Sequence, residues 1–147
     1  MEQLKVLLGR INHQYRVMDA IYHDMATGLG LSDSVLYILY SLAEEDRLVT
    51  QNELVQEWSL PKQTVNTAVS NLARQGLVYL ETASGKRKVI RLTEQGRRLV
   101  SQKICPVMDA ECRAFARLTE EERKTYLALM ERHTAYLREE AQHVCQS

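Results

Sequence analysis

The chain has 147 residues, about the length of one domain, and its 45% hydrophobic and 26% charged residues are close to the average of globular proteins. Its 19 Lys/Arg equal its 19 Asp/Glu, and this balance argues against an intrinsically disordered chain and against a protein that holds nucleic acid by bulk charge. Because no apolar run approaches about 18 residues and no signal peptide is evident, we expect a cytoplasmic protein without membrane contact.

The N-terminal part of the chain is expected to form two helices. Between residues 4 and 25, apolar side chains recur every three or four positions, which is typical of one face of an amphipathic helix. Gly28 and Gly30 are expected to end this helix. A second helix follows the N-cap residue Ser32 and runs to about Glu45, and its dense apolar content predicts burial on more than one side.

Capping signals mark the next two helices. Thr50 and Glu53 have the spacing of a capping box, in which each side chain bonds the backbone of the other residue, and they open a short third helix. Pro61 suits the first position of a fourth helix, because its missing N–H would have no helical partner there. We expect this fourth helix to run to about Gln75 and to stop at Gly76.

The pattern then changes from helix to strand and back. Residues 77–81 and 89–92 are two β-prone runs around a turn with a basic tip, which predicts a hairpin. A fifth helix begins near Glu94, and Pro106 is expected to bend or break it near Ile104.

The two terminal helices carry apolar stripes that need a partner. The last helix opens with a second capping box, Thr119 and Glu122, and extends to about His143. The terminal stripes either pack on each other within one subunit or form a core shared by two copies. We favour the shared core, because long terminal helices of a small domain rarely bury a full face alone. The residues expected at this dimer interface are Leu4, Leu8, Ile11, Leu127, Met130 and Leu137.

The zero net charge conceals an uneven distribution along the chain. Residues 47–100 contain nine Lys/Arg and four Asp/Glu, so this segment carries a formal charge of +5 and the rest of the chain −5. A neutral protein with a basic middle segment is a better candidate for local phosphate contact than its net charge suggests.

The fourth helix has one apolar face and one polar face that is mostly uncharged. Amides and hydroxyls suit base edges in the major groove, whereas a merely solvated face more often carries Glu and Lys. We therefore predict that this helix reads DNA through Lys62, Gln63, Thr64, Asn66, Thr67, Ser70, Asn71 and Arg74. The hairpin tip follows directly and can reach an adjacent groove or the backbone through Ser84, Lys86, Arg87 and Lys88.

The order of the predicted elements resembles a winged helix-turn-helix, and the flanking helices make the chain similar to the MarR family of bacterial transcriptional regulators. The likeness is carried by residues 31–42 (LSDSVLYILYSL), 50–54 (TQNEL), 61–78 (PKQTVNTAVSNLARQGLV) and 89–96 (VIRLTEQG). It implies a mostly α fold with a small β-hairpin wing. Residues 31–100 would form the DNA-binding lobe, and residues 1–30 and 101–147 the helical dimerisation region.

The resemblance also implies a mechanism. A homodimer would place two lobes on the halves of a pseudo-palindromic operator in double-stranded DNA, about one DNA turn apart. Transcription, usually repressed by such a protein, would be relieved when a small-molecule effector shifts the spacing of the lobes. The expected effector pocket lies between the dimer helices and each lobe and is lined by His13, Tyr15 and Tyr37.

The chain departs from the family pattern at the wing tip and on the fourth helix. Many members have Asp followed by Arg at the tip, where this chain has Ser84, Gly85 and Lys86, so that Lys86 or Arg87 takes the minor-groove role without a neighbouring Asp. On the helix, Thr67 and Asn71 stand where basic residues are frequent. We therefore expect fewer phosphate contacts there and a larger contribution from the wing.

Other chemistry has little support in the sequence. The four histidines form neither HxxxH nor HExxH, and the chain has no GxSxG, P-loop or Gly-rich dinucleotide motif, so we expect no metal, no cofactor and no enzymatic activity. The thiols of Cys105, Cys112 and Cys145 are expected to be buried. Two alternatives stay open: a winged-helix module that binds protein without an operator, and a redox regulator that uses these three cysteines.

Overall fold

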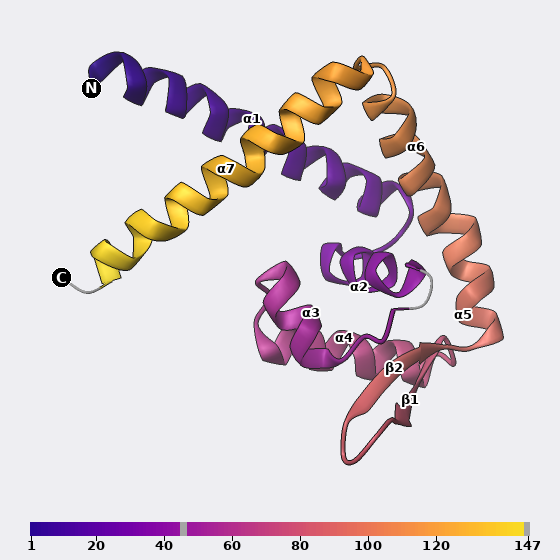
Figure 1. Cartoon of the computed structure of the whole chain (residues 1–147). Helices are drawn as coiled ribbons and strands as arrows, with labels where there is room; N and C mark the ends of the chain where they lie inside the picture. Colours follow the sequence, from indigo (N-terminus) through magenta and orange to yellow (C-terminus); the bar gives the residue numbers. More distant parts are fainter. Residues whose placement is uncertain (45–46, 146–147) are drawn as a thin grey trace. The chain divides into compact units, whose positions relative to one another are not determined.

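The computed structural model describes residues 1–44 and 47–145 (Figure 1). The chain divides into two compact units, Met1–Val107 and Met108–Ser147. The elements are α1 (Glu2–Gly28), α2 (Asp33–Ala43), α3 (Gln51–Trp58), α4 (Lys62–Arg74), β1 (Val78–Thr82), β2 (Lys88–Leu92), α5 (Glu94–Leu99), the π-helical turn η1 (Val100–Ile104), α6 (Cys105–Phe115) and α7 (Glu120–Cys145). The predicted class, mostly helical with one small hairpin, is confirmed.

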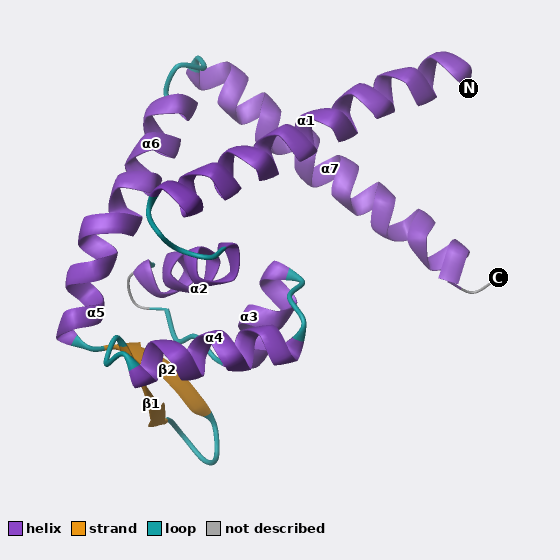
Figure 2. Cartoon of the chain, turned by 180° about the vertical axis from the view of Figure 1, so that it is seen from behind, coloured by secondary structure: helices purple, strands orange, loops and turns teal. Residues whose placement is uncertain are grey.

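The core of the first unit surrounds α2. This helix packs against α1, α3, α4, β2 and η1. Figures 1 and 2 show it between α1 on one side and α3 and α4 on the other. Leu36, Ile38 and Leu39 are at most 1% exposed, which confirms that α2 is buried on more than one side. The Ser32 hydroxyl caps its start by accepting from the Val35 N–H at 3.3 Å. The helix ends at Ala43, and Glu45, its predicted end, lies outside the described residues.

The two strands form an antiparallel hairpin that is bonded to the loop before α3. Val78 lies opposite Leu92 and Leu80 opposite Ile90 in the hairpin register. The Ile90 N–H also donates to the Val49 carbonyl at 2.7 Å, so Val49 forms an isolated bridge to β2. Each strand lies within one residue of its predicted limits. Strand β2 is therefore bonded on one side to β1 and on the other, at its middle residue Ile90, to the chain leading into α3.

The sequence contains a helical glycine whose small size is required by packing. A Cβ built on Gly96 in α5 would meet the backbone carbonyl oxygen of Leu77 far inside van der Waals contact. That carbonyl accepts the N–H of Thr93, the N-cap of α5, at 3.0 Å. The Thr93 hydroxyl donates to the Gly76 carbonyl at 2.6 Å, so the start of α5 is tied to the end of α4. Gly76 has φ of +72° and ends α4, as predicted.

The sequence predicts that Pro106 bends or breaks the fifth helix near Ile104, and the break does not occur. The chain stays helical from α5 into α6, and the distortion is a π-helical turn at Val100–Ile104, where the Cys105 N–H donates to the Val100 carbonyl. Pro106 has no N–H to give to the carbonyl four residues earlier. A wider turn just before the proline changes the bonding pattern at that point, so the helix continues without a break.

The second unit contains the end of α6 and the long α7. The capping box Thr119–Glu122 opens α7 as predicted, with the Thr119 N–H donating to Glu122 at 2.7 Å. The Phe115 ring meets Tyr126 edge to face at a centroid distance of 6.1 Å, which fastens the turn between α6 and α7. No helix within residues 1–44 and 47–145 has both the length and the apolar character needed to cross a lipid bilayer.

The prediction of buried thiols is also wrong. Cys105, Cys112 and Cys145 are all exposed and free. In the segment around Cys105, the inward positions are taken by Ile104 and Val107, which are at most 4% exposed, so the thiol faces outward.

Candidate nucleic-acid interface

Helix α4 has the two faces that its sequence predicts. Val65, Ala68, Val69 and Leu72 are buried against the core. Of the predicted DNA-reading residues, Thr64 is half-buried and the others are exposed; these are Lys62, Gln63, Asn66, Thr67, Ser70, Asn71 and Arg74. Pro61 is the N-cap, one residue before its predicted position. The polar face is therefore accessible along the full length of the helix.

A hollow of about 350 Å³ lies between the start of α2 and α4. Four of the predicted α4 residues share its lining: Gln63, Thr64, Thr67 and Asn71. Ser32 and Ser34 add hydroxyl groups from the α2 side. Arg74 lies one turn further along α4 and donates to the Asn71 side-chain oxygen at 3.1 Å. The structure thus gathers amides and hydroxyls, which suit hydrogen bonding to base edges, around one hollow.

The basic residues of the wing lie at the hairpin turn. The Ala83 N–H donates to the Arg87 carbonyl at 2.8 Å and closes the turn, in which Gly85 has φ of +73°. This left-handed conformation favours glycine. Ser84, Lys86, Arg87 and Lys88 are all exposed. Within the described residues, no ion pair holds Lys86 or Lys88, so both ammonium groups are available to a phosphate.

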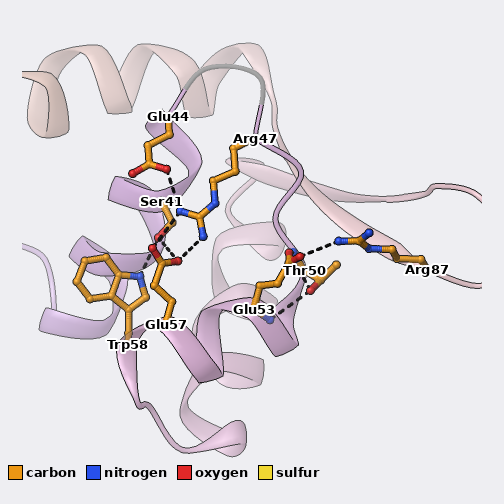
Figure 3. A network of polar contacts seen from close by, with 8 residues as sticks. All are labelled: Ser41, Glu44, Arg47, Thr50, Glu53, Glu57, Trp58 and Arg87. Atoms are coloured by element: carbon orange, nitrogen blue, oxygen red, sulfur yellow. Dashed lines mark hydrogen bonds and ion pairs between the residues drawn. The ribbon is translucent and has the colours of Figure 1, made fainter. Parts of the chain in front are cut away.

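Arg87 is in a different situation, because its guanidinium is paired with Glu53 of α3. Arg87 Nη2 lies 2.7 Å from Glu53 Oε1, across 34 residues of sequence (Figure 3). Glu53 also completes the capping box: its Oε2 accepts from the Thr50 N–H at 2.7 Å. This backbone bond lowers the pKa of Glu53 below its usual value, with a further contribution from Arg87. Sequence reasoning identified the cap and the basic tip separately and missed their connection.

A second polar network joins α2 to α3, and sequence reasoning missed this one as well. Arg47 donates to Glu57 from both terminal nitrogens, at 3.0 and 2.5 Å, and to Glu44 at 2.9 Å (Figure 3). The bonds from Glu57 raise the pKa of Arg47, so the guanidinium stays charged. The buried Ser41 hydroxyl accepts from Trp58 Nε1 at 2.7 Å and donates to Glu57 at 3.4 Å. The network holds the end of α3 against α2, and so helps to fix the helices that support α4.

Replacing Ser41 with alanine tests this network. Ser41 is 1% exposed, and its removal leaves the Trp58 N–H without its acceptor. We expect Ser41→Ala to lower the free energy of unfolding by about 1–2 kcal/mol, measured by urea denaturation. Ser34→Ala is the matched control in the same helix, because Ser34 is half-buried and its hydroxyl lies 3.3 Å from the exposed Ser32 hydroxyl rather than in this network. Equal stability of the two variants would contradict a role for Ser41 in joining the helices.

The three predicted effector-pocket residues are not brought together by the contacts described here. His13 and Tyr15 are exposed on α1. Tyr37 is half-buried on α2 and stacks on Trp58 at a centroid distance of 4.6 Å. Burial raises the pKa of Tyr37, with smaller contributions from Asp33 and Asp19, so the phenol stays protonated at neutral pH. The assignment of these residues to a pocket stays a prediction.

A larger hollow, of about 600 Å³, lies between the end of α2, the hairpin and the helical segment from α5 to Cys105. Its lining includes Arg47, Tyr79, Arg91, Arg97 and Cys105. Arg91 is held by Glu81 at 2.8 Å, and Arg97 donates to the Leu92 carbonyl at 3.3 Å. The guanidinium groups around this hollow therefore already have partners within the protein.

The six predicted dimer-interface residues are all exposed in the single chain. Their exposed fractions are 63% for Leu4, 42% for Leu8, 38% for Ile11, 57% for Leu127, 38% for Met130 and 61% for Leu137. Large apolar side chains in regular rows are costly to leave in water. The stripes therefore still need a partner surface.

Comparison with known proteins agrees with this arrangement. A family model described as "MarR family" matches residues 29–88, from the end of α1 through the hairpin turn. This part of the chain is therefore similar to the MarR family, and the MarR resemblance predicted from the sequence is confirmed. A search of curated protein sequences returns no significant match.

Solved structures of MarR family proteins match this chain along most of its length. NMB1585, a MarR family regulator from Neisseria meningitidis, is 24% identical, with a TM-score of 0.79 over 97% of this chain and 99% of the other. A MarR family transcriptional regulator from Silicibacter pomeroyi is 25% identical, with a TM-score of 0.67 over 88% and 86%. MepR from S. aureus, solved as a DNA complex, is 24% identical, with a TM-score of 0.67 over 89% and 94%. These matches confirm the winged-helix fold.

Proposed function

We propose that this chain is a MarR family regulator, a homodimeric repressor that binds a pseudo-palindromic operator in double-stranded DNA. The observation that carries the proposal is the pairing of two exposed surfaces on one lobe. The amide and hydroxyl face of α4 suits base edges, and the basic turn between β1 and β2 suits phosphate or the minor groove. The complex of MepR with DNA supports a DNA-binding role for the same fold.

The proposal assigns a task to each part of the chain. Residues 31–100 form the lobe that contacts DNA, and residues 1–30 and 101–147 form the dimerisation region. The uncovered apolar rows on α1 and α7 support the second assignment, since a partner copy would remove them from water. Two lobes related by a two-fold axis would then read two half-sites about one DNA turn apart.

The remaining part of the proposal is release by a small molecule. Its support is the similarity to the MarR family, with His13, Tyr15 and Tyr37 as the candidate contacts. A thermal-shift screen of aromatic acids and drugs, with DNA release as the second readout, tests it. Compounds that raise the melting temperature without releasing DNA would bind the protein but would not regulate its binding to DNA.

The wing supplies the sharpest test of DNA binding. We expect the double variant Lys86→Ala, Arg87→Ala to bind the chain's own upstream DNA at least about tenfold more weakly. The slope of log K against log salt concentration should become shallower by up to about 3.6, because the dimer loses four basic side chains and each lost phosphate contact contributes about 0.9. Fluorescence anisotropy at several salt concentrations measures both quantities.

The control removes a lysine of similar exposure far along the sequence from the wing. Lys124 in α7 pairs with Glu120 at 2.5 Å and is 74% exposed, so Lys124→Ala should leave affinity and slope unchanged. Absence of DNA affinity in the wild-type protein at low salt would overturn the proposed function and would favour a protein-binding winged-helix module. A wing variant with an unchanged slope would exclude the wing from the interface.

A further inference from the structure

Glu53 connects two parts of the lobe through its two carboxylate oxygens. Oε2 accepts from the Thr50 N–H at 2.7 Å and from the Thr50 hydroxyl at 3.1 Å, and so completes the cap of α3. Oε1 accepts from Arg87 Nη2 at 2.7 Å, at the tip of the wing (Figure 3). A single carboxylate therefore ties the start of α3 to a residue of the proposed DNA contact.

The ion pair orients Arg87 without using up its hydrogen-bonding capacity. A guanidinium has five N–H donors, and the contact with Glu53 engages only the Nη2 end. The Nε and Nη1 donors remain for a phosphate oxygen or a base edge, and the Arg87 side chain is 49% exposed. The cap fixes the carboxylate in turn, because Oε2 is held by two bonds from Thr50.

The surroundings of the pair place Arg87 beside the other basic groups of the wing. A hollow of about 360 Å³ is lined on the wing side by Lys86, Arg87 and Lys88, and on the α3 side by Thr50 and Gln51. The turn itself, residues 83–88, contains no acid, so the carboxylate that holds Arg87 comes from another element. Without it, the long Arg87 side chain would have to be ordered at the moment of binding, at a cost in conformational entropy.

We propose that Glu53 is a positioning residue for DNA binding, which holds the Arg87 guanidinium in the orientation that the operator contacts. The inference rests on the proposed function. One effect opposes it, since removing a negative charge near DNA favours binding. That effect weakens as salt is raised, because salt screens exposed charges, whereas the entropy cost of ordering Arg87 does not depend on salt in this way. We expect the loss of orientation to dominate at about 0.15 M salt.

The substitution Glu53→Gln separates the two tasks of this side chain. Glutamine is accepted at this position of a capping box, so its amide oxygen can still receive the Thr50 N–H. An amide has no second oxygen for Arg87. We expect Glu53→Gln to weaken operator binding about threefold to tenfold, measured by fluorescence anisotropy at 0.15 M salt. In an Arg87→Ala background the same change should have no further effect, whereas in a Lys86→Ala background it should keep its full effect.

Two matched variants control for charge and for capping. Glu81→Gln removes an acid and an ion pair from the same hairpin, that of Glu81 with Arg91 at 2.8 Å, and should change affinity less than twofold. Glu122→Gln makes the same change in the capping box of α7. It should leave DNA affinity unchanged, and it should shift the urea midpoint by no more than Glu53→Gln does.

The outcomes distinguish this inference from the proposed function. Tighter binding by Glu53→Gln would overturn the inference, because Glu53 would then compete with DNA for Arg87. An unchanged DNA affinity would overturn it as well. An equal loss of DNA affinity in the Arg87→Ala background would also overturn it, because Glu53→Gln would then act by disturbing the fold and not through Arg87. In each of these cases wild-type binding would still support the proposed function, whereas a wild-type protein that binds no DNA would overturn both.

Discussion

Replacing Gly96 with alanine should destabilise the winged-helix lobe by about 3 kcal/mol or more. The new Cβ would overlap the Leu77 carbonyl oxygen, lie 3.0 Å from the Leu77 carbonyl carbon and lie 3.2 Å from Leu92 Cδ2. The carbonyl cannot move freely, because it accepts the Thr93 N–H at the start of α5. Relief of the overlap would separate α5 from the hairpin. Urea denaturation followed by circular dichroism measures the loss.

Gly28→Ala is the control for a glycine in a helix with open space around it. A Cβ at Gly28 meets nothing within 4 Å, so alanine there should change stability by less than about 1 kcal/mol, and in the stabilising direction. A Gly96→Ala protein as stable as the wild type would show that the hairpin and α5 are packed less closely than described here.

Two acidic residues on the stripe of α1 should convert the proposed dimer to a monomer. Leu8 and Ile11 are 42% and 38% exposed in one protomer and lie on the same face of the helix. Burying a carboxylate without a partner costs several kcal/mol, so the double variant Leu8→Glu, Ile11→Glu should not assemble. We expect the mass by light scattering to halve and operator affinity to fall at least about 100-fold, since each lobe then binds one half-site alone.

Arg10→Glu is the matched control for this pair. It changes the net charge by the same two units on the same helix, but at a position that points away from the stripe. The control should stay dimeric and keep most of its affinity. A wild-type protein that is already monomeric at micromolar concentration would contradict the assignment of α1 to dimerisation.

The features that could be predicted from the sequence are those governed by interactions within about one helical turn. The capping boxes at Thr50 and Thr119 and the end of α4 at Gly76 are confirmed. The two faces of α4 are confirmed for the same reason, because a period of 3.6 residues determines which side chains point inward. The family resemblance rested on these same local patterns in residues 31–96.

The effect of Pro106 and the exposure of the cysteines could not be predicted in the same way. A proline removes one N–H, but whether the helix breaks or takes a π-helical turn depends on the packing of the residues around it, here Val100 and Ile104, which are at most 6% exposed. The thiol of Cys105 faces outward because its neighbours Ile104 and Val107 occupy the buried side.

The sequence by itself therefore determined the order of the elements, their caps, the polar face of α4 and the basic tip of the wing. Only the tertiary structure decided that Glu53 holds Arg87, that Val49 joins the hairpin through Ile90, and that Gly96 has no room for a side chain. The physical reason is the sequence separation between the residues that interact. Helix caps and periodicity depend on neighbours three or four residues away, whereas contacts across 34 residues depend on how the intervening turns direct the chain.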